Sequence, residues 1–355
     1  MLVIDDSALM RKMITQMLQR DGAIEVVGTA MDGTFGLRKI EELRPDVVTL
    51  DLEMPQMDGI ETLRQIMRRN PLPVIVVSSH STEGASETFK ALQLGAFDFV
   101  AKPQENVSTM IDTIADELVA KVKVAGTARK PKVEVASVDE QRLLQVRKPP
   151  RPAQNKRMNP SKIVAIGIST GGPNALLYLL SQLPADFPGS IVVVQHMPQG
   201  FTQMFSHRLN EACAIDVKEA QSGDLLLAGR ALICPGNRHM RVRHMPLGDV
   251  VVLADDGRVN GHRPSADVLF RSVAQEFGAK TVALIMTGMG EDGADGIKAV
   301  KDAGGLAVAQ DEASSVVFGM PKVAIERGNV NRVVPLDALA NLLQVQCATQ
   351  RAITT

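Results

Sequence analysis

Short runs of apolar, β-branched residues alternate with longer amphipathic segments along most of this 355-residue chain. Five such runs in the first third predict buried strands. They cover residues 2–5, 24–30, 46–51, 73–78 and 97–101. The segments between them have helical periodicity, as in residues 7–20, which begin with a serine suited to an N-cap. This alternation predicts a doubly wound parallel sheet with helices on both faces.

The same alternation returns in the second half and predicts a second doubly wound α/β domain. Its expected strands are residues 162–166, 190–195, 282–286 and 306–310. Residues 231–252 are broken by turns such as Pro235-Gly236-Asn237, so we expect a hairpin appendage there.

A basic, proline-containing stretch separates the two halves. Twelve Lys or Arg residues stand against three acidic residues between Lys121 and Lys162. Large apolar residues are few, so the stretch cannot bury enough surface to order itself. We therefore predict a first domain at 1–121, a flexible linker at 122–160 and a second domain at 161–349. A nucleic-acid role for the linker is disfavoured, since basic linkers are often merely solvated.

Composition excludes several classes of protein. No apolar run approaches the roughly 18 residues of a membrane span, and the first residues lack an export signal. The three cysteines are far apart, without metal-type spacing, which favours reduced thiols in a cytoplasmic protein. Tryptophan is absent and there is one tyrosine, so an aromatic platform for single-stranded nucleic acid is not expected.

Acidic residues follow the predicted strands of the first domain. Asp5 and Asp6 close the first strand and Asp51 closes the third, while Ser78 ends the fourth and Lys102 follows the fifth. Carboxylates gathered at one sheet edge repel one another unless a cation lies among them, and oxygen ligands suit Mg²⁺. One carboxylate could then accept a phosphoryl group. Each acid alone could equally be a helix N-cap, but joint placement at three strand ends favours the phosphoryl site.

The second domain begins with Gly167-Ile168-Ser169-Thr170-Gly171, between an apolar run and a helical segment. A G-x-S-x-G turn from strand to helix presents a serine hydroxyl beside free helix N–H groups, which suits a nucleophile. A Gly-rich turn entering a helix is the alternative. Nucleotide binding is disfavoured because the glycine spacing differs from G-x-G-x-x-G and no Walker lysine follows.

A serine nucleophile needs a base and an orienting acid. His196 ends the run 191–195 at the same predicted sheet edge as Ser169; His262 is its rival, with a substrate-lining or structural role fitting it better. Asp292 follows another strand across a glycine turn, and Asp295 is its rival on the next helix. The turn at 287–293 could equally be a phosphate loop. The remaining histidines are expected on the surface: His80, His207, His239 and His244.

The first domain resembles the receiver domain of two-component response regulators. The matching residues are Asp5-Asp6-Ser7, Asp51-Leu52-Glu53-Met54-Pro55 with Asp58-Gly59, Ser78-Ser79 and Lys102-Pro103. The resemblance implies a flavodoxin-like fold, phosphorylation at Asp51, and Mg²⁺ held by Asp6 and Asp51 with Asp5 nearby. It also implies switch roles for Ser78, Phe99 and Lys102.

The second domain resembles the effector domain of the CheB family of chemotaxis methylesterases. Six ordered blocks carry this resemblance: residues 166–172, 195–198, 234–236, 262–265, 287–293 and 318–321. It implies a Rossmann-like hydrolase domain with Ser169 as nucleophile, His196 as base and Asp292 as its orienting acid, without a cofactor in that site. The backbone N–H groups of Thr170 and Met289 become the candidate oxyanion donors.

The family resemblance implies an adaptation enzyme of bacterial chemotaxis. Its substrates would be glutamyl methyl esters and glutamines of methyl-accepting chemoreceptors, and a chemotaxis histidine kinase would supply the phosphate. Neither nucleic-acid binding nor membrane insertion is expected. Two other classes stay open: a non-catalytic phospho-switch that only binds receptors, and a transcriptional regulator. No helix-turn-helix pattern follows the first domain, which disfavours the regulator.

Overall fold

The computed structural model describes residues 1–79, 81–102, 108–127 and 159–348. The chain divides into two compact units, Met1–Val138 and Asp139–Thr355. Most of the predicted linker, 128–158, lies outside the described residues, and the remaining limits of the three predicted segments stay predictions. Among the described helices, none has the length and apolar character needed to cross a membrane.

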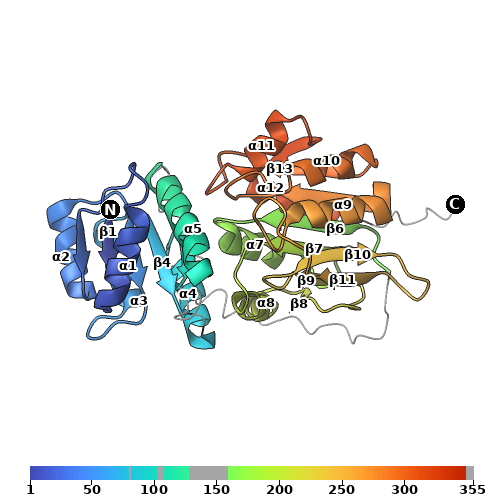
Figure 1. The fold of residues 1–355 in the computed structure, drawn as a ribbon. Helices are drawn as coiled ribbons and strands as arrows, with labels where there is room; N and C mark the ends of the chain where they lie inside the picture. Colours follow the sequence, from blue (N-terminus) through green and yellow to red (C-terminus); the bar gives the residue numbers. More distant parts are fainter. Residues whose placement is uncertain (80, 103–107, 128–158, 349–355) are drawn as a thin grey trace. The chain divides into compact units, whose positions relative to one another are not determined.

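The first unit is a five-stranded, all-parallel sheet in the order β2-β1-β3-β4-β5 (Figure 1). Its strands are β1 (Leu2–Ile4), β2 (Gly28–Ala30), β3 (Val48–Asp51), β4 (Val74–Ser78) and β5 (Asp98–Ala101). Its helices are α1 (Ala8–Leu18), α2 (Gly33–Leu43), α3 (Gly59–Arg69), α4 (Thr82–Gln93) and α5 (Ser108–Thr127). This strand order is that of flavodoxin-like folds.

Helices cover both faces of this sheet, with α1 against α5 on one side and α2, α3 and α4 in succession on the other. The central strands are therefore buried throughout, which explains their nearly continuous apolar sequence. Ser7 accepts a hydrogen bond from Met10 N at 3.3 Å and caps α1 as predicted. The predicted strand at 24–30 is shorter in the structure, where only Gly28–Ala30 pair with β1.

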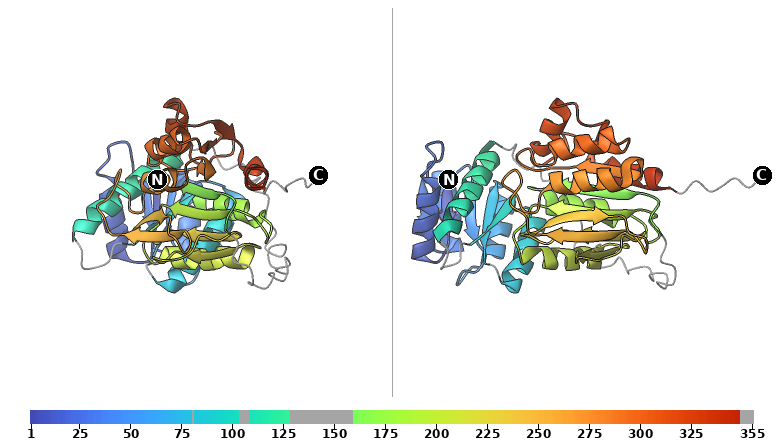
Figure 2. Two further views of the ribbon diagram at one scale, coloured as in Figure 1. Left: turned by 90° about the vertical axis from the view of Figure 1, so that its right-hand side faces the viewer. Right: turned by 45° about the vertical axis from the view of Figure 1, so that its right-hand side comes forward.

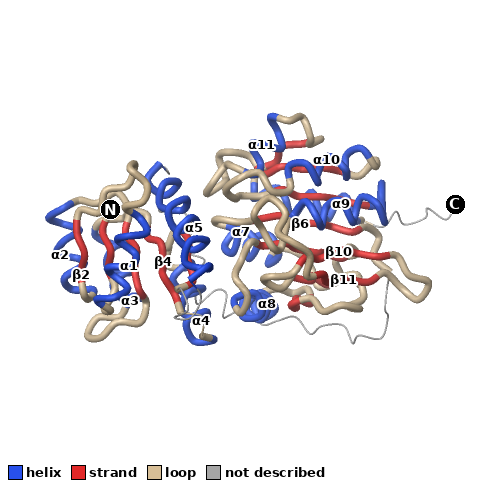
Figure 3. Tube along the Cα trace, in the orientation of Figure 1, coloured by secondary structure: helices blue, strands red, loops and turns tan. Residues whose placement is uncertain are grey.

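The second unit is a seven-stranded, all-parallel sheet in the order β14-β13-β12-β6-β7-β9-β8. Figure 3 draws strands in red and helices in blue, with β6 labelled in this unit. Its strands are β6 (Ile163–Ile168), β7 (Ser190–Gln195), β8 (Asp216–Glu219), β9 (Arg230–Ile233), β12 (Thr281–Ile285), β13 (Leu306–Gln310) and β14 (Arg332–Val334). Its helices are α7 (Gly172–Ser181), α8 (Phe201–Ala212), α9 (Ala266–Phe277), α10 (Ala294–Asp302), α11 (Met320–Glu326) and α12 (Leu336–Cys347), with a 3₁₀ turn at Gly278–Lys280. A parallel-sheet α/β fold in both units confirms the predicted fold class.

The expected appendage at 231–252 is only partly correct. Its first part is β9, which pairs with both β7 and β8 and so belongs to the main sheet. The actual hairpin joins β10 (His239–Arg243) and β11 (Val250–Ala254) as a separate antiparallel pair packed against α9 (yellow to orange in Figure 2). The Pro235-Gly236-Asn237 turn divides the two, so the break lies after β9 rather than before it.

The strand order places three chain segments at one edge of the second sheet. From the central strand β6 the chain moves first to β7 on one side and later to β12 on the other. Such a reversal opens a crevice at the carboxyl ends of the strands, where ligands bind in open α/β sheets. The residues that follow β6, β7 and β12 are those from which the sequence predicts catalysis.

Candidate active site

Ser169 lies in a tight turn between β6 and α7. Its N–H donates to Thr287 O at 3.0 Å, which ties the turn to the segment after β12. Gly171 has φ of 76° and precedes the first residue of α7. A side chain at Gly171 would be strained by this φ and would also press on Val316. The strand–turn–helix geometry predicted around Ser169 is present.

Space beside the Ser169 side chain is kept open by Gly288. A Cβ atom added there would lie 2.8 Å from Ser169 Cβ and would collide with the sulfur of Met320. The block 318–321 packs behind this turn, with the N–H groups of Gly319 and Met320 both donating to Gly288 O, at 3.1 and 2.9 Å. Residues 318–321 therefore support the turn that lies beside Ser169.

His196 and Asp292 form a direct hydrogen bond. His196 follows β7, and its N–H continues the strand ladder to Ile168 O at 3.0 Å, next to Ser169. Its Nε2 lies 2.8 Å from Asp292 Oδ2. The Asp292 side chain is fully buried. Its hydrogen bonds are therefore made to neighbouring protein groups rather than to solvent.

The N-terminus of α9 surrounds the Asp292 carboxylate with donors. Ser265 Oγ donates to Oδ1 at 2.6 Å, Ala266 N donates to Oδ2 at 2.6 Å, and Asn260 Nδ2 adds a longer bond of 3.2 Å. Burial alone would raise the pKa of Asp292, but the bonds from His196, Ser265 and Ala266 outweigh it and lower the pKa to about 2. The carboxylate is therefore anionic at neutral pH.

The second nitrogen of His196 is unengaged. Its Nδ1 is buried and has no hydrogen-bond partner within the described parts of the chain. The ring stacks on His262, with centroids 3.9 Å apart and an interplanar angle of 6°. His262, the rival base, thus lies against the face of His196, while Asp295, the rival acid, is on the surface of α10 paired with Arg327.

The amides of Thr170 and Met289 are both available as donors. Neither N–H has a protein acceptor among the described residues. The carbonyl oxygen of Thr170 accepts a hydrogen bond from the Thr287 hydroxyl at 2.9 Å. Met289 follows Gly288, the residue that lies beside Ser169. Backbone N–H groups without acceptors in the segments next to Ser169 are of the kind that can stabilise an oxyanion.

Several groups of this site were not predicted from sequence. Ser265 reads as an ordinary N-cap, yet it makes no capping bond because its hydroxyl donates to Asp292. Gln195, the last residue of β7, donates from Nε2 to both Ser169 O and His196 O, at 3.0 and 3.1 Å. The signal was present as a polar residue that follows four apolar residues at the end of the strand.

The expectation of solvent-exposed histidines is wrong for His239. This residue lies in β10, is fully buried and has Nε2 at 2.9 Å from Gly257 O. His207 and His244 are exposed as expected, and His80 lies outside the described residues.

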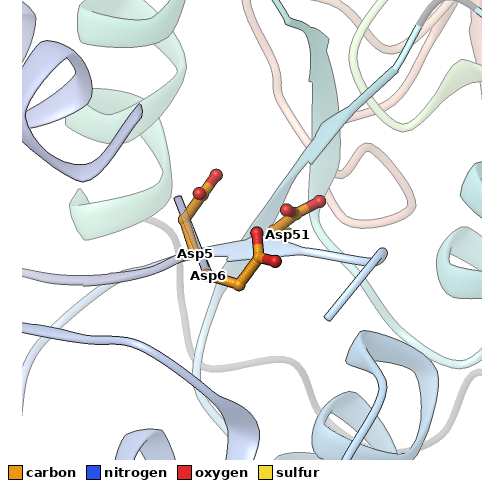
Figure 4. Close-up of side chains that lie close together, drawn as sticks. All are labelled: Asp5, Asp6 and Asp51. Atoms are coloured by element: carbon orange, nitrogen blue, oxygen red, sulfur yellow. The ribbon is translucent and has the colours of Figure 1, made fainter. Parts of the chain in front are cut away.

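Three carboxylates gather at the corresponding edge of the first unit (Figure 4). One oxygen from each of Asp5, Asp6 and Asp51 can be chosen so that all lie within 4.8 Å of one another. Asp5 is buried, and its Oδ2 has no hydrogen-bond partner among the described residues. Burial and the neighbouring Asp51 raise the pKa of Asp5 to about 6, with Lys102 opposing them. An all-oxygen set with an unsatisfied buried carboxylate oxygen fits Mg²⁺.

Lys102 contacts this cluster directly. Its Nζ lies 2.6 Å from Asp51 Oδ2 and 3.8 Å from Asp5 Oδ2. Burial raises the pKa of Asp51, and the Lys102 hydrogen bond only partly offsets this. The sequence prediction placed these side chains at the ends of the first, third and fifth strands, and the structure brings them together.

The two other receiver residues face α4 and its neighbours. Ser78 is buried, accepts a hydrogen bond from Thr88 Oγ1 at 2.6 Å and donates to Gly84 O at 3.1 Å. Phe99 is also buried, with its ring edge-on to Phe89 at 6.5 Å between centroids. Both side chains therefore contact α4, from the end of β4 and from β5.

Fold and sites together define a receiver-type α/β domain followed by an α/β domain with a serine, a histidine and a buried aspartate at one sheet edge. Comparison with protein families agrees: residues 1–115 match the response regulator receiver domain, and residues 164–343 match CheB methylesterase. The chain belongs to the CheB methylesterase family and carries a receiver domain.

Relatives of known name cover almost the whole chain. A protein-glutamate methylesterase/protein-glutamine glutaminase 2 of Koribacter versatilis is 78% identical, covering 99% of this chain and 96% of its own. One from Symbiobacterium thermophilum is 46% identical, covering 96% and 95%. The solved CheB methylesterase catalytic domain of Thermotoga maritima is 40% identical over 52% of this chain and 98% of its own, with a TM-score of 0.51.

The low pKa of Asp292 predicts a pH-dependent loss of stability. Ionised Asp292 stabilises the fold above about pH 4, and this contribution disappears as the pH falls towards about 2. Asp292→Asn cannot titrate there, so wild type should lose about 2 kcal/mol more unfolding free energy than the variant over that interval. Urea unfolding followed by the fluorescence of Tyr178, the sole tyrosine of a chain without tryptophan, reports on the second unit.

The matched control for this measurement is Asp295→Asn. Asp295 is an exposed carboxylate in the same segment, and exposed charges are screened by solvent. The control should keep the wild-type pH dependence. Parallel curves for wild type and Asp292→Asn would contradict the prediction.

Proposed function

We propose that this protein is a phosphorylation-activated protein-glutamate methylesterase and protein-glutamine glutaminase acting on chemoreceptors. The hydrogen bond between His196 and Asp292, beside the Ser169 turn, carries this proposal. The names of the relatives support the substrate class, and the receiver domain supports control by phosphorylation.

In this proposal Ser169 attacks the carbonyl carbon of a glutamyl methyl ester. Since Nε2 of His196 is held by Asp292, Nδ1 is the nitrogen that takes the proton from Ser169 Oγ. The same Nδ1–H then protonates the departing methoxide, and methanol leaves. Water attacks the acyl-enzyme with Nδ1 as base, which releases the glutamate and restores the serine hydroxyl.

Asp292 has a fixed electrostatic role in this cycle. Its carboxylate stays ionised, orients the imidazole through Nε2 and stabilises the imidazolium that forms when Nδ1 is protonated. The N–H groups of Thr170 and Met289 stabilise the oxyanion. The loss of one such donor typically costs about 2.7–4 kcal/mol of transition-state stabilisation.

The same residues account for hydrolysis of glutamine. The serine forms the same acyl-enzyme, and His196 protonates the departing amide nitrogen, which leaves as ammonia in place of methanol. The amide leaving group is poorer and depends more on protonation by His196. The ester is therefore the easier substrate.

Asp51 is the proposed phosphoacceptor of the first unit. Asp6 and Asp51, with Asp5 nearby, would hold Mg²⁺, which would neutralise charge on the phosphoryl oxygens. Lys102, at 2.6 Å from Asp51, is placed to bind the transferred group. A chemotaxis histidine kinase in the cytoplasm is the proposed phosphodonor.

A non-catalytic phospho-switch that only binds receptors is the second candidate. The receiver domain alone would serve that function. It gives no reason for a serine turn with two unused amide donors and a histidine held by a buried anion.

Ser169→Ala should abolish methanol release from methylated receptor membranes. Without the nucleophile we expect turnover to fall on the order of 10⁴-fold or more. Ser181→Ala, at the exposed far end of α7, is the control and should retain wild-type activity. Equal methanol release from wild type and Ser169→Ala would refute the hydrolase and favour the binding-only switch.

Asp51→Asn should remove activation by acetyl phosphate and Mg²⁺ while basal activity remains. Wild type is expected to rise at least about tenfold, which needs about 1.4 kcal/mol of differential stabilisation. Asp116→Asn, on the exposed side of α5, should respond like wild type. Activation of Asp51→Asn to the wild-type level would place the phosphoacceptor elsewhere.

A further inference from the structure

Gln195 connects the two segments that carry the proposed nucleophile and base. It is the last residue of β7 and is only 2% exposed. Its two Nε2 hydrogens are both used, one on Ser169 O at 3.0 Å and one on His196 O at 3.1 Å. A single buried amide thus bonds the main chain of both residues.

The backbone offers few other links at this point. The ladder between β6 and β7 ends with Ile168 opposite Gln195, followed by the bond from His196 N to Ile168 O. Beyond it the chain turns into α7 on one side and leaves the strand on the other. The Gln195 side chain replaces the ladder where Ser169 and His196 have left the sheet.

The orientation of this amide is determined by its surroundings. Two carbonyl oxygens require the NH₂ group, so Oε1 points towards the start of α7. There a Cβ added at Gly172 would collide with Oε1. Oε1 itself is buried without a hydrogen-bond partner in the described residues. Both N–H donors of the Gln195 amide are therefore used, whereas its carbonyl oxygen is buried without a donor, which is energetically unfavourable.

We propose that Gln195 is a positioning residue that sets the relative placement of Ser169 and His196, with Gly172 providing the space for its amide. Gln195 touches neither substrate nor a reacting atom and acts through the two carbonyls. This inference rests on the proposed hydrolase function. It predicts an effect on turnover rather than on substrate binding, because only the alignment of serine and imidazole changes.

Gln195→Met tests the proposal in the full-length protein, since methionine has nearly the same length but no N–H donor. Methanol release from methylated receptor membranes would give kcat and KM, and a fluorophosphonate would count the reactive serines. We expect kcat per titrated serine to fall about 10- to 100-fold with KM within about twofold of wild type, because small misplacements of reacting groups cost that much.

Two further variants separate alignment from packing. Gln195→Glu keeps the shape but places oxygen against both carbonyls, and Gly172→Ala keeps Gln195 but displaces its amide. Both should lower kcat per titrated serine in the same way. Gln182→Met, at an exposed glutamine bonded to Tyr178 O, is the control and should match wild type.

The measurements separate failure of the Gln195 proposal from failure of the hydrolase function. If Gln195→Met keeps wild-type kcat per titrated serine, with any loss of activity explained by fewer reactive serines or a lower melting temperature, Gln195 is only structural and the proposal fails. If wild type releases methanol no faster than Ser169→Ala, the hydrolase function itself fails.

Discussion

The site of the second unit depends on one buried anion. Taking a carboxylate out of water is costly unless donors replace its hydration, and Asp292 is fully buried. The replacement comes from the first N–H of α9, the Ser265 hydroxyl and the His196 ring. A helix N-terminus adds its own favourable field, worth about 0.3–1 kcal/mol and up to about 2 in partly buried sites. Because these donors fix the carboxylate, the carboxylate fixes the imidazole.

That constraint decides the role of each histidine nitrogen in the proposed mechanism. With Nε2 of His196 bound to Asp292, only Nδ1 remains for the proposed proton transfer from Ser169. The ring of His262 stacks on one face of this imidazole. A group oriented in this way loses little entropy when the reaction begins, which is the main advantage of a preorganised site.

Sequence alone could predict the sheets and the strand-end residues, for a physical reason. Central strands buried on both faces give continuous apolar runs, and the carboxyl ends of parallel strands meet at one edge. That reasoning predicts Ser169, His196 and Asp292 at one edge, but it left His262 and Asp295 open as alternatives. It failed for the short strand β14, which is mostly exposed, and for β9, whose pairing with β7 and β8 is decided by tertiary contacts.

The supporting residues were unpredictable for another reason. Ser265 and Asp292 are 27 positions apart, and Gln195 and Ser169 are 26 apart, so no local pattern links them. The local signal for Ser265 even points to a different role, an N-cap. The orientation of the His196 ring depends on those contacts, so it too required the structure.

Both units place aspartates at the carboxyl ends of parallel strands, yet the surroundings shift the pKa of the aspartate in opposite directions. Asp292 faces N–H and O–H donors, which lower its pKa to about 2 and make it a permanent anion. Asp5 loses hydration and faces Asp51, which together raise its pKa to about 6. A donor-rich pocket needs no further ligand, because its charge is already compensated. An acid-rich pocket with a single lysine is under-compensated, which is the physical reason for proposing a cation there. The same side chain on the same kind of sheet edge therefore has its charge compensated by the protein in one unit and, in the proposed function, by a bound cation in the other.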